Sequence, residues 1–398
     1  MTLSSIPLDK IVESDLQSLI DNEVAEGKAI DYKQELSGNS DTEKKEFLFD
    51  VSSFANAGGG DLFYGIKEDK GIPIEICGID VSDRDEVRLQ LENKIRDCIQ
   101  PRIPGLKIHF VPLANGKFVL ILRIPRSFAQ PHMVTFKNAS RFYSRNSAGK
   151  YQLDVGEIRT AFTLSQSITD RIRDFRRDRL SAIVSGETPV LMEEGAKFVL
   201  HLIPINAFDL VANLNLLSII NKPRVKEKLS PLTFHEYQNY TSQYNFDGYL
   251  TSIGSRDFSL SSSYLQVFRS LTFEATSSQD FDIYNETKII YRTCDLNILS
   301  GIKNFLEIYK CLEIEIPVFI MLSFLNVKNY FICLHDGQRS IGGRQIDRDN
   351  LILPEIVIED FNVNIERVMK PIFDTVWNAA GIVRSPNYDE QGNWIVGR

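Results

Sequence analysis

The chain has 398 residues, of which 43% are apolar and 25% charged, a composition typical of folded proteins rather than disordered ones. This length provides for two or three domains with ample cores. No run of 18 apolar residues occurs, so we expect no membrane partner. The five cysteines are scattered without a Cys-x-x-Cys pair, which favours a cytoplasmic location and argues against a structural zinc site.

The net charge of −8 is unevenly distributed along the chain. Residues 1–101 carry 11 Lys and Arg against 22 Asp and Glu, a balance of −11, whereas residues 102–184 carry 15 against 5, a balance of +10. Carboxylates beside cations are what a metal-using site on a polyanion requires. The alternative is that both sets of charges simply face solvent.

The first elements are predicted from periodicity. Residues 8–23 have the apolar face and the acidic surface of an amphipathic helix. Alternation over residues 26–36 predicts a strand, in which Asp31 and Lys33 project from the same face. These two charged side chains are therefore expected to be neighbours.

A helix, a glycine turn and a strand are predicted next. Ser40 or Asp41 is expected to cap a helix from Thr42 to about Asn56. Three glycines, residues 58–60, then turn the chain into an apolar strand over residues 61–67. A glycine run serves either as an ordinary helix-to-strand connection or where the backbone approaches something closely.

The pattern continues with alternating elements. A turn at residues 68–71 leads into a strand at 74–79, and residues 83–100 predict a second amphipathic helix. Residues 106–113 and 117–124 flank an Asn-Gly pair and predict a hairpin. Helices and strands in this order predict an α+β protein whose N-terminal part is an α/β sandwich.

Several short motifs between residues 26 and 68 occur in a fixed order. They comprise Glu26, Asp31, Tyr32 and Lys33, then Ser53-Phe-Ala-Asn56, Gly58-Gly59, Gly65-Ile66 and Glu68. Together they resemble the Schlafen-type AlbA-2 domain, over roughly residues 15–160. Asp31 stands where the family usually has Glu, and Lys67 stands where another acid is common. The resemblance implies a nucleic-acid-binding sandwich in which the strands that carry the acids pair.

The acids of this pattern predict a site for chemistry. In eukaryotic Schlafen proteins the matching acids serve a metal-dependent endoribonuclease, so the resemblance implies that Glu26, Asp31 and Glu68 are catalytic and bind Mg²⁺ or Mn²⁺. Asp69 is the expected additional metal ligand, and Lys33 the expected phosphate contact. Such a metal would neutralise the charge that develops when a phosphodiester is cleaved.

A second stretch supplies cations and aromatic rings. Arg141, Arg145 and Lys150 are candidate phosphate contacts, and Phe142 and Tyr143 are candidates for stacking on a base. The competing interpretation is an ordinary strand and turn whose arginines are solvated.

Two other functions compete with the nuclease. One is a non-catalytic DNA- or RNA-binding module of a regulator, which would depend on Lys33, Arg141, Arg145 and Lys150. The other is ATP binding at the glycine turn, although there is no G-x-x-x-x-G-K-[ST] motif and the following Asp61 would repel a phosphate. A bacterial origin and a regulatory or defence role follow from the resemblance alone. A homo-oligomer stays open.

The domains are predicted as residues 1–164, a linker over 165–189 and a second α+β domain over 190–398. Thr169–Ile183 is rich in arginine, but an aspartate recurs every four residues, which favours a solvated, self-neutralised linker helix over nucleic-acid contact. The second domain resembles a region often attached to bacterial AlbA-2 proteins, a resemblance that implies no activity. Arg269, Glu355 and Asp374 are candidates for a second site, with structural ion pairs as the alternative.

Overall fold

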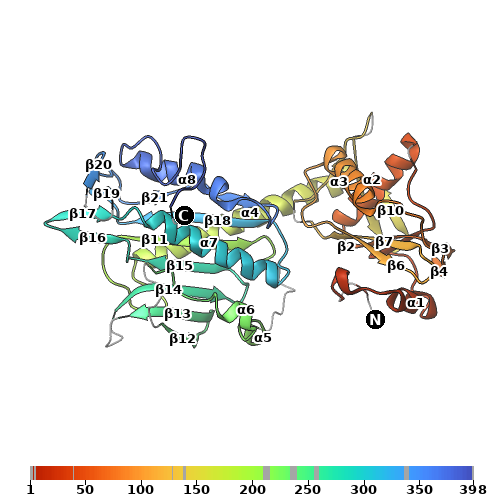
Figure 1. Cartoon of the computed structure of the whole chain (residues 1–398), viewed down its shortest axis with the longest axis horizontal. Coiled ribbons are helices and arrows are strands. Elements are labelled where there is room, and N and C mark those ends of the chain that lie inside the picture. The colour runs from red at the N-terminus through yellow and green to blue at the C-terminus, as the bar shows by residue number, and fades with distance from the viewer. Residues whose placement is uncertain are drawn as a thin grey trace. The chain divides into compact units, whose positions relative to one another are not determined.

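A computed structural model describes residues 3, 6–38, 40–127, 129–137, 140–208, 216–233, 240–254, 260–335 and 340–396. The chain divides into two compact units, Met1–Ile168 and Thr169–Arg398. In Figure 1 the boundary between them falls where the colour changes from yellow to green. Both units combine helices and strands, and this confirms the predicted α+β class.

A four-stranded sheet forms the centre of the N-terminal unit. Its order is β1 (Ile30–Lys33), β2 (Gly59–Tyr64), β7 (Phe118–Pro125) and β6 (Lys107–Pro112). β1 and β2 are parallel and are joined through helix α2 (Asp41–Ala55), whereas the other pairs are antiparallel, including the predicted β6–β7 hairpin. One face packs on α2 and α3 (Arg84–Cys98), and the other on α1 (Glu13–Asp21) and the 3₁₀ helix η2 (Leu8–Lys10).

A second, smaller sheet packs against the opposite side of α2. It is formed in order by β10 (Gly149–Gln152), β9 (Arg141–Asn146), β8 (Met133–Val134) and β5 (Ile99–Gln100). The ring of Tyr143 in β9 stacks on Phe49 of α2, with their centroids 4.1 Å apart. Because α2 lies between two sheets, polar residues of this helix such as Asp50 are buried together with its apolar ones.

The ends of α2 explain two of the sequence motifs. At its start Ser40 and Glu43 form a capping box, which confirms the cap predicted at Ser40. After its end the Asn56 carboxamide accepts a hydrogen bond from the His132 amide at 2.6 Å and donates to the carbonyls of His132 and Tyr143 at 2.9 and 2.8 Å. Asn56 therefore ties α2 to β9 and to the segment before β8.

The glycine turn makes a close backbone approach. Gly59 has φ of +74°, and a Cβ at this position would lie 2.5 Å from the amide nitrogen of Arg126 and 2.7 Å from the carbonyl oxygen of Ile124. The space beside this glycine is thus filled by β7 and the residue that follows it. These contacts favour a structural role for the turn over a cradle for ATP phosphates.

The strand predicted over residues 61–67 ends earlier than expected. Gly65, with φ of +97°, separates β2 from β3 (Ile66–Asp69), which forms a hairpin with β4 (Ile72–Ile76). Glu68 therefore belongs to β3, whereas the strand paired with β1 is β2. The predicted pairing of the strands over residues 26–36 and 61–67 is confirmed by β1 and β2, but Glu68 lies on the next strand and not at the end of the paired one.

Helix α4 (Val155–Val184) is a single element of 30 residues, and the division between the units falls within it. The helix predicted over residues 169–183 is confirmed, and Arg177 pairs with Asp174 on its surface, but not every arginine is solvated. Arg176 is buried and donates to Ser323 and to the carbonyls of Leu322 and Leu353. The aspartates of the repeat stay exposed, so the periodicity marks the solvent face of a helix whose other face is buried.

A large sheet forms the centre of the second unit. Its order is β12 (Thr241–Tyr244), β13 (Gly248–Gly254), β14 (Ser261–Phe268), β15 (Phe273–Ser277), β11 (Lys197–Pro204), β18 (Val318–Leu325) and β21 (Leu351–Ile352), and β22 (Ile356–Ile358) also pairs with β18. Helices α7 (Cys294–Cys311) and α8 (Ile365–Ala379) cover one face around the main core. Leu180 and Ile183 of α4 pack on the other face.

The remaining elements lie around this sheet. A four-stranded sheet has the order β16 (Phe281–Tyr284), β17 (Thr287–Ile290), β19 (Tyr330–His335) and β20 (Ser340–Gly342). Two short helices, α5 (Leu216–Ile220) and α6 (Pro223–Lys226), contribute Leu216, Ile220 and Val225 to the main core.

A buried ion pair joins α4 to the sheet in the second unit. The Arg179 guanidinium donates to both carboxylate oxygens of Glu274 at 2.8 and 2.9 Å. The ring nitrogen Nε2 of His201 lies 3.0 Å from the same carboxylate, and the Tyr264 hydroxyl donates to it at 2.8 Å. Burial acts to raise the pKa of Glu274, but the hydrogen bonds and charges of Arg179 and His201 outweigh it and lower this pKa to about 2.

A second buried carboxylate fixes the C-terminal segment. One oxygen of Asp295 accepts hydrogen bonds from the Trp377 indole, the Ser385 hydroxyl and the Asn387 carboxamide, each at 2.9 Å. Burial raises the pKa of Asp295 to about 6, against the opposing effect of these three donors.

Candidate functional site

Asp31 and Lys33 lie where the strand alternation places them. In β1 they stand opposite Leu62 and Tyr64 of β2, on the face of the sheet that packs on α2. The Lys33 ammonium donates to Asp31 Oδ1 at 2.6 Å. Burial acts to raise the pKa of Asp31, but Lys33 and Arg145 outweigh it and hold this pKa below its usual value. The predicted neighbourhood of the two side chains is confirmed.

Arg145 provides the second cation on Asp31. From β9 its guanidinium donates to Asp31 Oδ2 at 2.8 Å and to the carbonyl of Gly27 at 3.2 Å. It also stacks over the Phe54 ring, 3.8 Å from the centroid. The Arg145 side chain is only 2% exposed, so in this arrangement it holds Asp31 in place and is not accessible to a nucleic-acid phosphate. That is a correction to its predicted role.

Lys150 is held by two acids of α2. Its ammonium donates to Asp50 at 2.8 Å and to Glu46 at 2.5 Å. Asp50 is buried, and burial raises its pKa although Lys150 and Lys33 oppose the rise. Sequence reasoning missed Asp50. The available signals were an acid inside the apolar run Phe47–Val51 and its spacing of four residues from Glu46, which places both carboxylates on one face of the helix.

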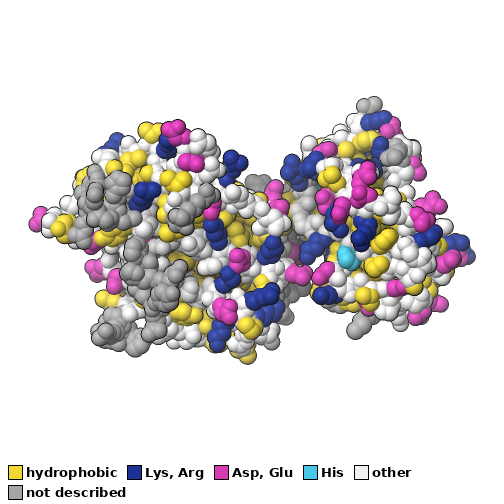
Figure 2. All heavy atoms as spheres, viewed as in Figure 1, with side chains coloured by type: hydrophobic (Ala, Val, Ile, Leu, Met, Phe, Trp, Pro, Cys, Tyr) yellow, Lys and Arg dark blue, Asp and Glu magenta, His cyan; other side chains and the backbone are white. Residues whose placement is uncertain are grey.

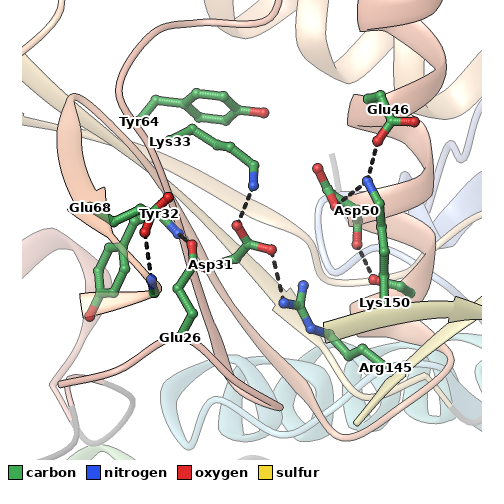
Figure 3. Close-up of polar contacts among 12 residues, drawn as sticks. Glu26, Asp31, Tyr32, Lys33, Glu46, Asp50, Tyr64, Glu68, Arg145 and Lys150 are labelled. Atoms are coloured by element: carbon green, nitrogen blue, oxygen red, sulfur yellow. Dashed lines mark hydrogen bonds and ion pairs between the residues drawn. The ribbon is translucent and has the colours of Figure 1, made fainter. Parts of the chain in front are cut away.

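Lys33 and Lys150 approach the same region from different sides. Figure 3 shows Asp31 and Asp50 lying between the two lysines, with Lys33 coming from β1 and Lys150 from β10. Burial acts to lower the pKa of both ammonium groups, but the nearby carboxylates, Asp50 first among them, outweigh it and raise both pKa values. The two side chains are 39% and 26% exposed, respectively. They are therefore charged groups that solvent can reach.

Glu26 and Glu68 both form hydrogen bonds with Gly71 in the turn between β3 and β4. The Tyr32 amide donates to Glu26 Oε1 at 2.8 Å, and the Gly71 amide donates to Glu68 Oε2 at 2.5 Å. The Glu26 amide donates to the carbonyl of Gly71 at 2.6 Å. Burial raises the pKa of Glu26 despite the hydrogen bond from Tyr32. Asp69, on the same hairpin, is exposed.

Carboxylates of the predicted Mg²⁺ or Mn²⁺ site already accept hydrogen bonds from the protein. Both oxygens of Asp31 are taken by protein cations, and one oxygen each of Glu26 and Glu68 accepts a backbone amide. No group of three or more His, Cys, Asp or Glu residues suited to a metal ion occurs among the described residues. The side chains as placed do not fit a divalent cation. Metal ligation by Glu26, Asp31, Glu68 and Asp69 stays a prediction.

Comparison with known proteins identifies the fold of this region. Residues 26–154 match the family model described as Schlafen, AlbA_2. The chain carries a Schlafen AlbA_2 domain. Two solved structures are similar to 35% of the chain, each at 21% identity and a TM-score of 0.25. One is a protein from Corynebacterium diphtheriae, of which 26% is covered, and the other is the N-terminal domain of a RecG-helicase-related protein from Nitrosomonas europaea, of which 92% is covered. No curated protein matches.

Several opposite charges of the AlbA_2 domain form ion pairs with each other. Arg123 binds Asp61 through two hydrogen bonds, at 2.8 and 2.9 Å, and Lys137 pairs with Asp41. Figure 2 shows cationic and anionic side chains mixed on the visible face of this domain. Part of the basic stretch, including Arg123, Arg145 and Lys150, thus pairs with acids of residues 1–101. This pairing differs from both expectations, a segregated polyanion site and independent solvated charges.

The other predicted contacts of the AlbA_2 domain differ in accessibility. Arg141 is exposed and donates only weakly, at 3.3 Å, to the carboxamide of Gln152. Tyr143 is stacked on Phe49, and Phe142 makes an edge contact with Phe162, 6.1 Å between centroids. These contacts occupy one face of Tyr143 and part of Phe142, so Arg141 is the most accessible member of the group.

The candidate residues of the second unit make structural contacts. Glu355 pairs with Arg173 of α4, and Asp374 accepts a hydrogen bond from the Ser385 amide at 2.9 Å. Arg269 donates to the carbonyl of Phe246 at 3.1 Å. These contacts favour the alternative of structural ion pairs over a second site. No helix among the described residues has the length and apolar character required to cross a membrane.

Proposed function

We propose that the AlbA_2 domain binds nucleic-acid phosphates through Lys33 and Lys150 and that it does so as a binding module without cleavage. The observation that carries this proposal is the placement of two ammonium groups, from different strands, at the accessible margin of one buried carboxylate cluster. A phosphate that bridges both lysines would gain two charge-assisted hydrogen bonds. Arg141, exposed on β9, is the candidate for a further contact along the backbone.

The proposal selects one variant as the cleanest test. Lys33→Met removes an ammonium while Asp31 keeps its buried partner Arg145, so the local fold should survive. Lys150→Met instead leaves the buried Asp50 without its hydrogen-bonded cation and endangers the fold. Lys10→Met is the matched control, because Lys10 is exposed in η2, which covers the opposite face of the sheet.

The measurement is the fluorescence anisotropy of labelled single-stranded RNA, hairpin RNA and duplex DNA in EDTA, as a function of salt. We expect Lys33→Met to weaken binding about 3- to 10-fold on whichever nucleic acid binds, and to reduce the salt slope by about one. The control should bind like the wild type. Equal affinity and equal salt slope for wild type and Lys33→Met would overturn the proposed interface. Regulatory or defence roles stay predictions.

A further inference from the structure

The carboxylate that the sequence predicts as a metal ligand already has a cation of the protein's own. We propose that the Arg145 guanidinium takes the place of a divalent cation beside Asp31, so that this AlbA_2 domain meets phosphate with protein cations and excludes a metal there. The inference deepens the proposed function, on which it rests for the identity of the ligand, but its test reads metal binding directly.

The first argument is the occupancy of the Asp31 oxygens. Oδ1 accepts from the Lys33 ammonium at 2.6 Å, and Oδ2 accepts from the Arg145 guanidinium at 2.8 Å. A Mg²⁺ or Mn²⁺ ion binds by direct coordination to carboxylate oxygens. Such an ion would have to bind beside both cations, and their charges would oppose its entry.

The second argument is that Arg145 is fixed in place. Three different segments hold its guanidinium: Asp31 of β1, the carbonyl of Gly27, and the Phe54 ring of α2. Its side chain is almost completely buried. Lys33 can move into solvent, whereas Arg145 cannot leave without breaking all three contacts. The guanidinium is therefore a permanent part of the site.

The third argument is that a buried hydrogen-bond donor of Arg145 is unpaired within the described part of the chain. Nη1 of Arg145 is buried and has no hydrogen-bond partner among the described residues. An unused donor is satisfied by an anion or a water and repels a cation. The unused donor beside Asp31 therefore disfavours a cation at this position.

The same pattern recurs at the other buried acids of the domain. Asp50 pairs with Lys150, and Asp61 is bound bidentately by Arg123. Each buried carboxylate named here has a cation supplied by a distant part of the chain. Arg145 is one instance of a consistent arrangement.

The inference is tested with Mn²⁺ alone, followed by the loss of its free-ion EPR signal and by calorimetry on the full chain. We expect the wild type to bind no Mn²⁺ more tightly than about 1 mM, and Asp31→Asn to behave identically. Arg145→Met leaves Asp31 with Lys33 alone, a cation that can move into solvent, and should gain at least about 10-fold in Mn²⁺ affinity. Circular dichroism establishes whether this variant is folded.

Two results would overturn the inference, and they differ from a failure of the proposed function. One is wild-type Mn²⁺ binding at micromolar concentration that Asp31→Asn abolishes. Another is a folded Arg145→Met that gains no affinity for Mn²⁺. If Arg145→Met does not fold, the comparison of wild type with Asp31→Asn decides alone. A protein that binds neither Mn²⁺ nor nucleic acid would refute the proposed function and leave the exclusion of metal standing.

Discussion

Replacement of Glu274 by Gln should abolish a large pH-dependent contribution to the stability of the second unit. The pKa of Glu274 is about 2 in the folded protein and 4.5 when the group is unperturbed. A difference of about 2.5 corresponds to roughly 3 kcal/mol at 1.36 kcal/mol per pKa unit. Because the folded pKa is the lower one, this stabilisation is fully present above pH 4.5 and is lost as the pH falls towards 2.

The assay uses the position of the two tryptophans. Trp377 and Trp394 both belong to the second unit, so their fluorescence during urea denaturation follows the unfolding of that unit. Between pH 6 and pH 3 the difference in unfolding free energy between wild type and Glu274→Gln should shrink by about 2 kcal/mol. Glu286→Gln, at an exposed turn glutamate, should track the wild type. A difference that stays constant over this pH range would refute the reasoning.

Two further predictions concern the other buried carboxylate and the glycine turn. Asp295 has a raised pKa of about 6, so its contribution is fully present below about pH 3.8 and is lost as the pH rises through 6. Asp295→Asn should therefore gain about 2 kcal/mol relative to wild type between pH 4 and pH 7, measured by tryptophan fluorescence; no change with pH would contradict this. Gly59→Ala should cost about 1–3 kcal/mol in the AlbA_2 domain, measured by circular dichroism. Gly58→Ala, where a Cβ meets only Lys28 at 3.7 Å, is its control, and equal losses in the two variants would contradict the close approach.

Local features of the candidate site were predictable from the sequence. The alternation around Asp31 and Lys33 places the two on one face of β1, and their hydrogen bond confirms it. Ser40 caps α2 as its side-chain chemistry suggests. The family pattern identified the AlbA_2 domain. Each of these features depends either on residues that are close in sequence or on the spacing of motifs along one continuous stretch of the chain.

Long-range pairing could not be predicted in this way. Arg145 reaches Asp31 across 114 positions, and no local pattern distinguishes a buried arginine on β9 from an exposed one such as Arg141. Asp50 is buried because a second sheet covers the outer side of α2. The burial of Arg176 in α4 is equally hidden from the local sequence, because its partner Ser323 lies more than 140 positions further along the chain.

The central claim is that the AlbA_2 domain binds nucleic acid with protein cations and without a metal. The most direct test incubates the full chain with labelled RNA and duplex DNA in EDTA and, in parallel, in Mn²⁺, and follows both retention and cleavage. We predict salt-sensitive retention that is equal in the two buffers, weakened in Lys33→Met, with every strand intact. Cleavage that requires Mn²⁺ and disappears in Asp31→Asn would contradict the account and restore the carboxylates as metal ligands.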